Sequence, residues 1–191
     1  MDAWERCIRA LDFEEPDRVP IYDFLYHDKV VEKVTGVSPS SGHQRYLRAK
    51  AKAFHLLGID MSPELDYPFK REIVELEGFV HIKDGYLDWI KERPFQSVED
   101  ILGWRPIFRD NLDSFVATFR EKQKMLGNKT MLIGGTGGIV DSLIQTLGHK
   151  FFFLLLYNYP KEIEAMLDAN TDGILEISKI YAENQLAPAI M

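Results

Sequence analysis

The sequence predicts an α/β fold in which short buried strands alternate with helices. A turn containing Pro16 and Pro20 separates a helical pattern at 4–11 from a β-branched and aromatic run at 19–23. Proline fixes φ and moves the preceding residue out of the helical region, so the first helix must end before this first strand. A helical pattern at 44–57 then follows, and a short apolar stretch succeeds it. Repetition of strand, helix and strand is typical of parallel pairing.

The predicted helices have recognisable start and stop signals. Gly36 and Gly58 each follow a segment with helical apolar spacing, where glycine commonly closes a helix. Asn111 stands where it can cap a later helix. We expect helices at 4–11, 29–35, 44–57, 97–102, 112–126, 139–147, 151–157 and 161–184. Because 151–157 is apolar on all sides, we expect it to be buried nearly all round in a complete barrel and to be exposed in part in a truncated one.

Four buried strands are expected between and after these helices, at 19–23, 59–61, 130–133 and 187–191. Asp84-Gly85 separates runs of alternating apolar and polar residues, and this dipeptide is typical of a hairpin turn. The sequence therefore predicts an antiparallel excursion near 72–91, inserted in a single domain that spans residues 1–191.

Composition restricts the class of protein. The 191 residues are 46% hydrophobic, which is enough for one globular core, and the net charge is −7. No run of Lys or Arg occurs, which argues against nucleic acid and against anionic membranes as partners. The sequence contains neither a signal peptide pattern nor eighteen consecutive apolar residues, so we expect a cytoplasmic protein. Cys7 has no partner for a disulfide, and its apolar helix favours burial as a small hydrophobe.

The stretch Glu-Glu-Pro-Asp-Arg-Val-Pro-Ile-Tyr at 14–22 resembles the opening of the uroporphyrinogen decarboxylase superfamily. Members of that superfamily begin with a helix, an acidic-Pro-Asp-Arg-(Val/Ile)-Pro turn and the first strand of a (β/α)8 TIM barrel. The rhythm of 147–163, with a glycine, an aromatic-rich helix, Pro160 and a further helix, is similar to the same family. The resemblance implies a barrel of the uroporphyrinogen decarboxylase type.

Four strands with their helices amount to about half of such a barrel, which typically takes roughly 250 residues. We therefore expect the N-terminal half of a barrel, either as a fragment of a longer enzyme or as a non-catalytic half that acts as an assembly partner. The missing C-terminal half or a second copy of the chain would cover the open edge. Turnover by the isolated chain is not expected, because barrel sites draw on several strands.

The resemblance covers two activities. True uroporphyrinogen decarboxylases of haem biosynthesis carry an arginine-rich stretch after the first strand that holds the substrate carboxylates, whereas 23–28 here contains two acids. Arginine forks are the usual partners of carboxylates, so this departure favours the methyltransferase relatives, which use a corrinoid or folate methyl carrier. The family tyrosine of a later helix falls near Gln145. Against this, Asp66 lies within one residue of the pyrrole-binding aspartate of the decarboxylase, which stays as the alternative.

Barrel enzymes place their chemistry at the carboxyl ends of strands. Asp23 and His27, four residues apart, would share a face if their loop were helical, and could then form an acid/base or ligand pair. A solvated loop pair is the simpler interpretation. Asp66 could accept a hydrogen bond from a substrate N–H, or from its own backbone in an Asx turn. The predicted catalytic residues are Asp23, His27 and Asp66.

A glycine-rich segment at 134–138 opens the helix at 139–147. Its backbone N–H groups could cradle an anion at the helix N-terminus, or the glycines could simply allow a tight turn. Neither a P-loop nor a dinucleotide-binding pattern is present. The predicted substrate-binding residues are Gly135, Thr136, Gly137 and Asp141, although Asp141 could instead complement the helix dipole.

No metal site is expected within this chain. Its five histidines show neither His-x-His nor His-x-x-x-His spacing, and Cys7 has no second cysteine. The resemblance implies that zinc, held by a His-x-Cys and a later Cys, would take its ligands from residues beyond Met191. The expected partners are a small-molecule substrate or a corrinoid protein.

Overall fold

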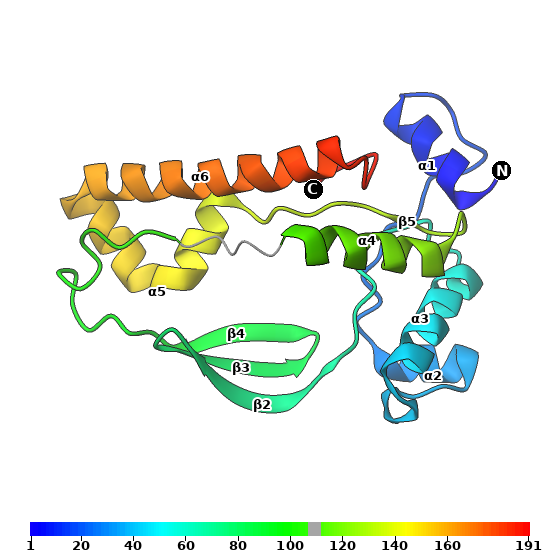
Figure 1. Cartoon of the computed structure of the whole chain (residues 1–191), viewed down its shortest axis with the longest axis horizontal. Helices are drawn as coiled ribbons and strands as arrows, with labels where there is room; N and C mark the ends of the chain where they lie inside the picture. The colour runs from blue at the N-terminus through cyan, green and yellow to red at the C-terminus, as the bar shows by residue number, and fades with distance from the viewer. Residues whose placement is uncertain (107–111) are drawn as a thin grey trace. The chain divides into compact units, whose positions relative to one another are not determined.

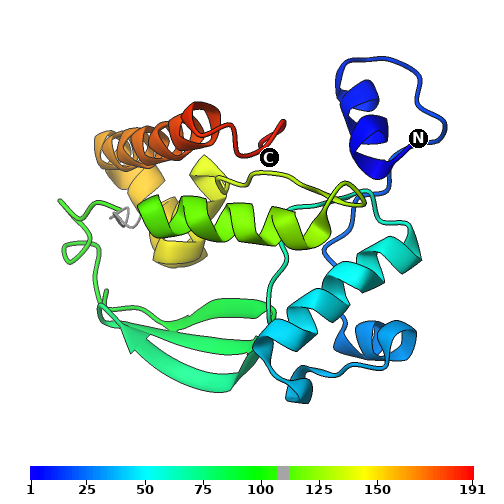
Figure 2. The ribbon, with the colours of Figure 1, turned by 45° about the vertical axis from the view of Figure 1, so that its right-hand side comes forward.

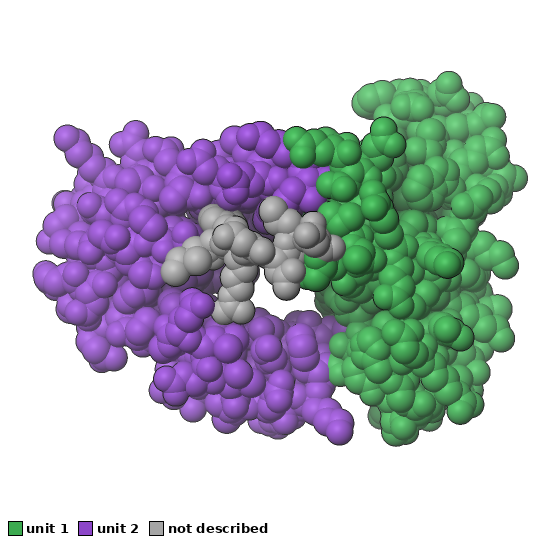
Figure 3. Space-filling view, in the orientation of Figure 1, with its two compact units in different colours: residues 1–68, 111–135, 181–191 green, residues 69–110, 136–180 purple. Residues whose placement is uncertain are grey.

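The structure, a computed structural model, describes residues 1–106 and 112–191 (Figure 1). It is a mixed α/β fold that divides into two compact units (Figure 3). Unit 1 consists of residues 1–68, 111–135 and 181–191, and unit 2 of residues 69–110 and 136–180. Each unit has its own packing.

Unit 1 carries four helices and a short 3-10 turn, namely α1 (Ala3–Leu11), α2 (Asp28–Thr35), η1 (Pro39–Ser41), α3 (His43–Leu57) and α4 (Leu112–Leu126). The carboxylate of Asp2 accepts a hydrogen bond of 2.8 Å from the Glu5 N–H and so caps α1. Gly36 and Gly58 end α2 and α3 at φ values of 74° and 70°, as their positions in the sequence predict. Helix α2 packs against α3 (Figure 2). The expected cap Asn111 lies outside the described residues.

The strands of unit 1 pair in parallel and in the order of the chain. β1 (Met61–Ser62) pairs with β5 (Met131–Leu132). Isolated parallel bridges extend this pairing on both sides, from Tyr22 to Met61 and from Gly134 to Ile190. Parallel neighbours in sequence order, joined by segments that contain helices, are typical of successive βα units. The described residues form part of an α/β fold and not a complete barrel.

The first and fourth predicted strands are much shorter than expected. Of 19–23 and 187–191, only Tyr22 and Ile190 form bridges. Pro20 and Pro188 have no N–H to donate, which limits how far pairing can extend at either position. The prediction of full strands at these two places is wrong, although their direction and neighbours are those of a parallel ladder.

Ion pairs join the 14–22 segment to the amino end of β1. The Arg6 guanidinium binds Asp17 through two hydrogen bonds of 2.6 and 2.9 Å, and donates a third of 2.6 Å to Asp60. Arg18 also binds Asp60, at 2.6 and 2.9 Å, and the Ile21 N–H donates to the same carboxylate at 2.9 Å. Asp60 directly precedes β1, so this network lies at the end of the strand opposite to its carboxyl end. The Pro-Asp-Arg turn is therefore held to the amino end of β1. In barrel folds, residues at this end of the strands contribute to stability.

The apolar side of α1 covers the same strands. Cys7 is fully buried and packs in one cluster with Met131 and Ile133. Burial raises the pKa of the Cys7 thiol to about 11, with the Asp60 charge acting in the same direction. Cys7 is thus a small apolar core residue, in agreement with the sequence.

Unit 2 begins with an antiparallel sheet of β2 (Phe69–Leu76), β3 (Phe79–Gly85) and β4 (Leu87–Glu92), in that order. Glu77 and Gly78 turn the chain between β2 and β3 with φ values of 53° and 81°, as a tight hairpin requires. The Asp84-Gly85 dipeptide lies at the turn between β3 and β4, where Asp84 pairs with Leu87.

The helix predicted at 97–102 is wrong. This segment contains hydrogen-bonded turns, in which the Asp100 carboxylate accepts 2.8 Å hydrogen bonds from the Gln96 and Ser97 N–H groups. Side chains that bond to their own backbone in this way compete with helix propagation. Ser97 and Asp100 do make capping hydrogen bonds with the backbone, but turns and not a helix follow them.

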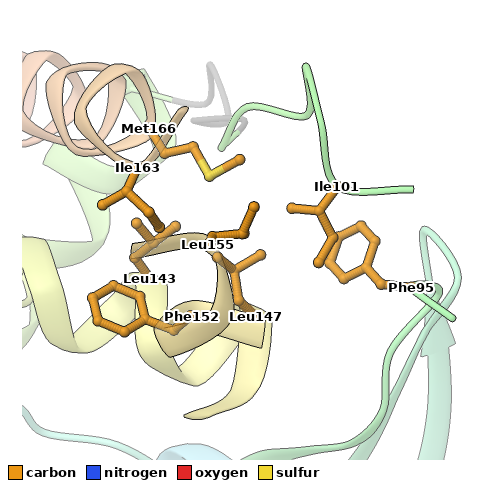
Figure 4. Close-up of a cluster of buried hydrophobic side chains, with 8 residues drawn as sticks. All are labelled: Phe95, Ile101, Leu143, Leu147, Phe152, Leu155, Ile163 and Met166. Carbon is orange, nitrogen blue, oxygen red and sulfur yellow. The ribbon is translucent and has the colours of Figure 1, made fainter. Parts of the chain in front are cut away.

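Helix α5 (Ile139–Asn158) and helix α6 (Pro160–Glu183) complete unit 2, although the last turn of α6 from Tyr181 belongs to unit 1. Gly148, at φ 77° and ψ 150°, breaks α5 into the two helical segments that the sequence predicts. The core between these helices and the 95–101 segment is shown in Figure 4, and consists of Phe95, Ile101, Leu143, Leu147, Phe152, Leu155, Ile163 and Met166.

The segment 151–157 is buried on one side only, and not nearly all round as a complete barrel would require. Phe152 and Leu155 are buried, but the side chains of Phe153, Leu156 and Tyr157 are exposed. Phe152 and Leu155 belong to the core cluster that includes Ile163 and Met166 of α6, and among the described residues of unit 2 this is the side of the segment that is covered.

Among the described helices, α5 has the length and hydropathy of a membrane-crossing helix. Its backbone leaves helical geometry at Gly148, and each part on either side has fewer residues than the roughly 20 that span a bilayer. The break therefore argues against a continuous membrane-spanning helix.

Candidate functional site at the carboxyl end of β1

The chain leaves β1 through Pro63, Glu64, Leu65 and Asp66, at the end of the strand opposite to the arginine network. The Ser62 hydroxyl donates a 2.9 Å hydrogen bond to the Glu64 carbonyl, and Leu65 is fully buried. These contacts fix the segment while Glu64 and Asp66 stay partly accessible. This is where barrel-type enzymes carry their functional loops.

A cleft of about 310 Å³ lies beside this segment within unit 1, and is called the unit 1 cleft below. It receives residues from the loop after Tyr22, the 63–66 segment, α4, β5 with the glycine that follows it, and the end of α6. Its lining consists of Phe24, Pro63, Glu64, Asp66, Phe115, Thr118, Phe119, Lys122, Leu132, Gly135 and Tyr181. A largely apolar cleft with a few convergent polar groups is the usual form of a small-molecule site.

Two carboxyl groups and an ammonium group meet in this cleft. The Lys122 ammonium donates a hydrogen bond to the Asp66 carboxylate, and Glu64 lines the same cleft as this pair. Burial raises the pKa of Glu64 to about 8, and Asp66 acts in the same direction. Burial alone would raise the pKa of Asp66, but its hydrogen bonds with Glu64 and Lys122 outweigh burial and lower that pKa. The two pKa shifts favour the protonated form of Glu64 and the ionised form of Asp66.

A second lysine lies beneath the same segment. Lys50 on α3 is fully buried, and its ammonium donates a 3.3 Å hydrogen bond to the Asp66 carbonyl and lies 5.7 Å from the centre of the Tyr26 ring. Burial lowers the pKa of Lys50 to about 8, although the Asp66 and Asp28 charges oppose this change. Lys50 thus places positive charge under Asp66 and joins α3 to the cleft segment.

The end of α6 closes the cleft next to the glycine-rich segment. A Cβ atom at Gly134 would lie 2.8 Å from Cε1 of Tyr181, so only glycine allows this ring to approach. The Gly135 N–H donates a 3.2 Å hydrogen bond to the Tyr181 hydroxyl. Gly134 is therefore explained by packing, and the Gly135 N–H that could cradle an anion already has a partner.

Asp66 and Gly135 are the two predicted site residues that the structure brings together, since both line the unit 1 cleft. Asp23 and His27 do not form the expected pair. Residues 23–27 have no helical turn, the Asp23 carboxylate accepts a 2.6 Å hydrogen bond from the Leu25 N–H, and His27 is the exposed N-cap residue of α2. The premise of a shared helical face is wrong, because Asp23 makes an Asx-type contact that favours an extended loop.

The other predicted substrate-binding residues belong to unit 2. Gly137 has φ 75°, and Gly138 is the N-cap of α5. The Asp141 carboxylate lies in the first turn of α5 and accepts a 2.7 Å hydrogen bond from the Gln145 amide. The Thr136 side chain is half-buried, and its hydroxyl donates a 3.4 Å hydrogen bond to the Gly137 carbonyl. Roles for Thr136, Gly137 and Asp141 in substrate binding stay predictions.

Sequence reasoning missed Glu64, Lys122, Lys50 and Tyr181. For Lys50 a signal exists, because it lies three residues after Leu47 and four before Phe54, on the apolar face of its helix. A lysine in that position predicts either a buried ammonium or an interrupted apolar face. Lys122 and Tyr181 are far from Asp66 in sequence, and a single sequence contains no signal that joins them.

Unit 2 has a hollow of its own, of about 540 Å³, which includes His81, Asp88, Arg93 and His149. His81 Nδ1 and the Asp88 carboxylate are 2.9 Å apart. The Arg93 guanidinium donates to the carbonyls of Gln145 and Thr146 at 2.6 and 2.8 Å, so it caps the first segment of α5 where Gly148 breaks the helix. The polar groups of this hollow thus have structural partners: His81 pairs with Asp88 in the sheet, and Arg93 caps the end of the helical segment.

The described residues do not fit a zinc site. Across 1–106 and 112–191, no group of three or more His, Cys, Asp or Glu side chains is placed to hold a metal ion. Cys7, the thiol of the chain, is buried beneath α1 and its Sγ lies 3.6 Å from the Asp60 carbonyl. No chemical step through zinc can be assigned to these residues.

Comparison with known proteins supports the fold. No protein-family model matches the sequence, and no curated protein matches it significantly. Among solved structures, a methyltransferase from Methanosarcina mazei matches 100% of this chain with a TM-score of 0.62 and 16% sequence identity. The match covers 58% of that methyltransferase, so this chain spans little more than half of its length. The chain thus shares the α/β fold of this part of the methyltransferase.

Proposed function

We propose that this chain is the N-terminal half of a methyltransferase-like enzyme of the uroporphyrinogen decarboxylase superfamily. The observation that carries the proposal is the parallel ladder of unit 1, from Tyr22 through Met61 and Met131 to the Gly134–Ile190 bridge, in the order of the chain. Its fold match to a methyltransferase runs over the entire chain. The Pro-Asp-Arg turn, which is locked by Arg6 and Asp60, supports the same superfamily.

The unit 1 cleft is the proposed substrate site of this enzyme. It lies at the carboxyl end of β1, and it contains groups whose pKa values depart from the ordinary range, a combination that is frequent at functional sites. Its apolar lining with Phe24, Phe115 and Phe119 suits a small organic substrate. A corrinoid protein or a folate would carry the methyl group in the complete enzyme, and zinc would take its ligands from outside this chain.

Uroporphyrinogen decarboxylase is the second candidate, and the position of Asp66 in the cleft favours it. The charges of the cleft oppose it. Glu64 and Asp66 face the space that a polycarboxylate would enter, and Lys122 is already paired with Asp66. A substrate with many carboxylates needs unpaired arginine or lysine groups, so the methyltransferase-like activity is the better supported of the two.

The test is to express the whole open reading frame that contains these residues and to assay two reactions. The first assay is methyl transfer from methylcobalamin to a thiol, which is monitored by the loss of methylcobalamin absorbance. The second assay measures the release of CO2 from uroporphyrinogen. We expect methyl transfer without decarboxylation. Decarboxylation alone would replace the proposal with its alternative, and neither activity would favour a half barrel that acts as an assembly partner.

A further inference from the structure

The lining of the unit 1 cleft has one carboxyl group more than it has cationic groups. Glu64 and Asp66 both line the cleft, and among the described residues of the lining Lys122 is the cationic side chain. The Lys122 ammonium is hydrogen-bonded to the Asp66 carboxylate, so its charge is already balanced within the wall. Glu64 is therefore the half-buried carboxyl group for which this lining holds no further cation.

Aromatic rings form much of the remaining wall. Phe115 and Phe119 come from α4, Tyr181 comes from the end of α6, and Phe24 comes from the loop after Tyr22. The Tyr181 ring is perpendicular to that of Phe115, with 5.4 Å between the ring centroids, and lies at 84° to that of Phe119, with 5.5 Å between the centroids. These edge-to-face contacts hold the three rings at fixed angles beside the carboxyl groups.

Different classes of ligand would meet this lining in different ways. An anion would be repelled by Glu64 and Asp66. A neutral apolar molecule would remove Glu64 from water without giving it a partner, which costs free energy. A metal ion needs several converging ligand atoms, and the described part of the chain holds no group of three or more side chains suited to it. An organic cation is attracted both by the carboxyl group and by the faces of aromatic rings.

The lining also distinguishes between kinds of organic cation. A primary ammonium group has three N–H donors, and each of them needs an acceptor when it leaves water. An alkylated nitrogen instead presents methyl groups, which pack against aromatic rings without unsatisfied donors. The volume of about 310 Å³ limits the ligand to a small molecule.

We propose that the unit 1 cleft binds a small organic cation with an alkylated nitrogen, such as a quaternary ammonium group. Glu64 is its counter-ion, and the rings of Phe115, Phe119 and Tyr181 contact its alkyl groups. The identification of this cation as the substrate rests on the function proposed above, whereas its binding is tested separately from turnover.

The test compares two probes that have the same shape and differ in charge. Choline carries a trimethylammonium group, and 3,3-dimethyl-1-butanol has a carbon atom in place of the nitrogen. In isothermal titration calorimetry with the 191-residue chain, we expect choline to bind at least about 10-fold more tightly than the neutral alcohol. Equal affinities, or no binding of choline, would overturn the inference.

Matched variants assign the binding to the cleft. Glu64→Gln keeps the shape of the side chain but removes its charge, and Phe115→Leu removes a ring but keeps an apolar group. Each should weaken choline binding by about 10-fold in a chain whose fold is verified by circular dichroism. The controls are Glu121→Gln and Phe13→Leu, which change exposed side chains and should leave the affinity unchanged. A choline affinity that neither cleft substitution alters would show that the cation binds elsewhere, and would refute the proposal.

Failure of this inference can be told apart from failure of the proposed function. If choline binds as expected but the product of the whole reading frame transfers no methyl group, the proposed function fails and the cation site stands. If that product transfers methyl groups from methylcobalamin while choline does not bind, the proposed function stands and the cation site is refuted.

Discussion

At the scale of single residues, the unusual groups of unit 1 lie at the two ends of one strand. Arg6 and Asp60, which are 7% and 2% exposed, form an ion pair at the amino end of β1. Lys50, Glu64 and Asp66 gather at its carboxyl end. Buried charge is expensive unless it is paired, so each group has a structural or a chemical reason to be there. Asp60 pairs with two arginines, whereas the Lys50 ammonium binds the Asp66 carbonyl. Mutations of Asp60 and of Lys50 should therefore affect stability in different ways.

Replacing Asp60 with Asn should destabilise the protein by about 3 kcal/mol. The substitution removes the negative charge of Asp60. The buried Arg6 guanidinium then lacks one of its two carboxylate partners, and Arg18 loses its ion pair with Asp60. Urea unfolding followed by circular dichroism measures the difference. The exposed Glu14→Gln, which removes one negative charge from the same region, should stay within about 0.5 kcal/mol of the native chain. Equal stability of both variants would show that the network contributes nothing.

Replacing Lys50 with Met should change how stability depends on pH. The pKa of Lys50 falls from 10.5 to about 8 on folding. Above pH 10.5 the amine is neutral in both states, and as the pH falls toward 8 the unfolded chain gains a proton that the folded chain resists. Native stability therefore falls across this window, by roughly 3 kcal/mol.

The Lys50→Met chain lacks this contribution, so the difference in unfolding free energy between the two chains should change across pH 8 to 10.5. Lys52→Met, an exposed substitution on the same helix, is the control and should follow the native chain at every pH. Parallel curves for the native and Lys50→Met chains would mean that Lys50 titrates normally.

At the scale of elements, helices could be predicted from the sequence far better than strands. Caps such as Gly36 and Gly58, together with 3.6-residue periodicity, are local signals, and α1, α2, α3 and α4 begin and end close to their expected positions. Strand length depends on partners that are distant in sequence, which is why 19–23 and 187–191 are single bridges. The site followed the same rule. Asp66, which lines the cleft, was predicted from its position after a strand and from the family resemblance, whereas Lys122 and Tyr181 come from elements that only folding brings near it.

The approach of α6 to the strand ladder gives a prediction with a matched control in the same loop. Gly134→Ala should destabilise the protein by about 2 kcal/mol, because its Cβ would lie 2.8 Å from the Tyr181 ring and force the end of α6 to move. A Cβ at Gly135 meets nothing within 4 Å, so Gly135→Ala should be nearly neutral. Thermal unfolding compares the two. A Gly134→Ala chain as stable as Gly135→Ala would contradict the close packing of Tyr181.

At the scale of the whole molecule, the parallel strand ladder has the arginine network at one end and the unit 1 cleft at the other. The arginine network precedes β1, and Glu64 and Asp66 follow it. This polarity is the arrangement of barrel-type enzymes, in which stability and chemistry occupy opposite ends of the strands. The fold of this chain matches 58% of a methyltransferase. We propose that the substrate binds in the unit 1 cleft.

The most direct measurement is the rate of methyl transfer by the product of the whole reading frame with Lys122→Met and, separately, with Lys124→Met. Both substitutions remove one lysine charge from α4, but Lys122 binds Asp66 in the cleft and Lys124 is exposed. We expect Lys122→Met to lower the rate at least about 100-fold, with the folded state verified by circular dichroism, and Lys124→Met to leave it unchanged. Equal rates in the two variants would contradict the assignment of the cleft as the functional site.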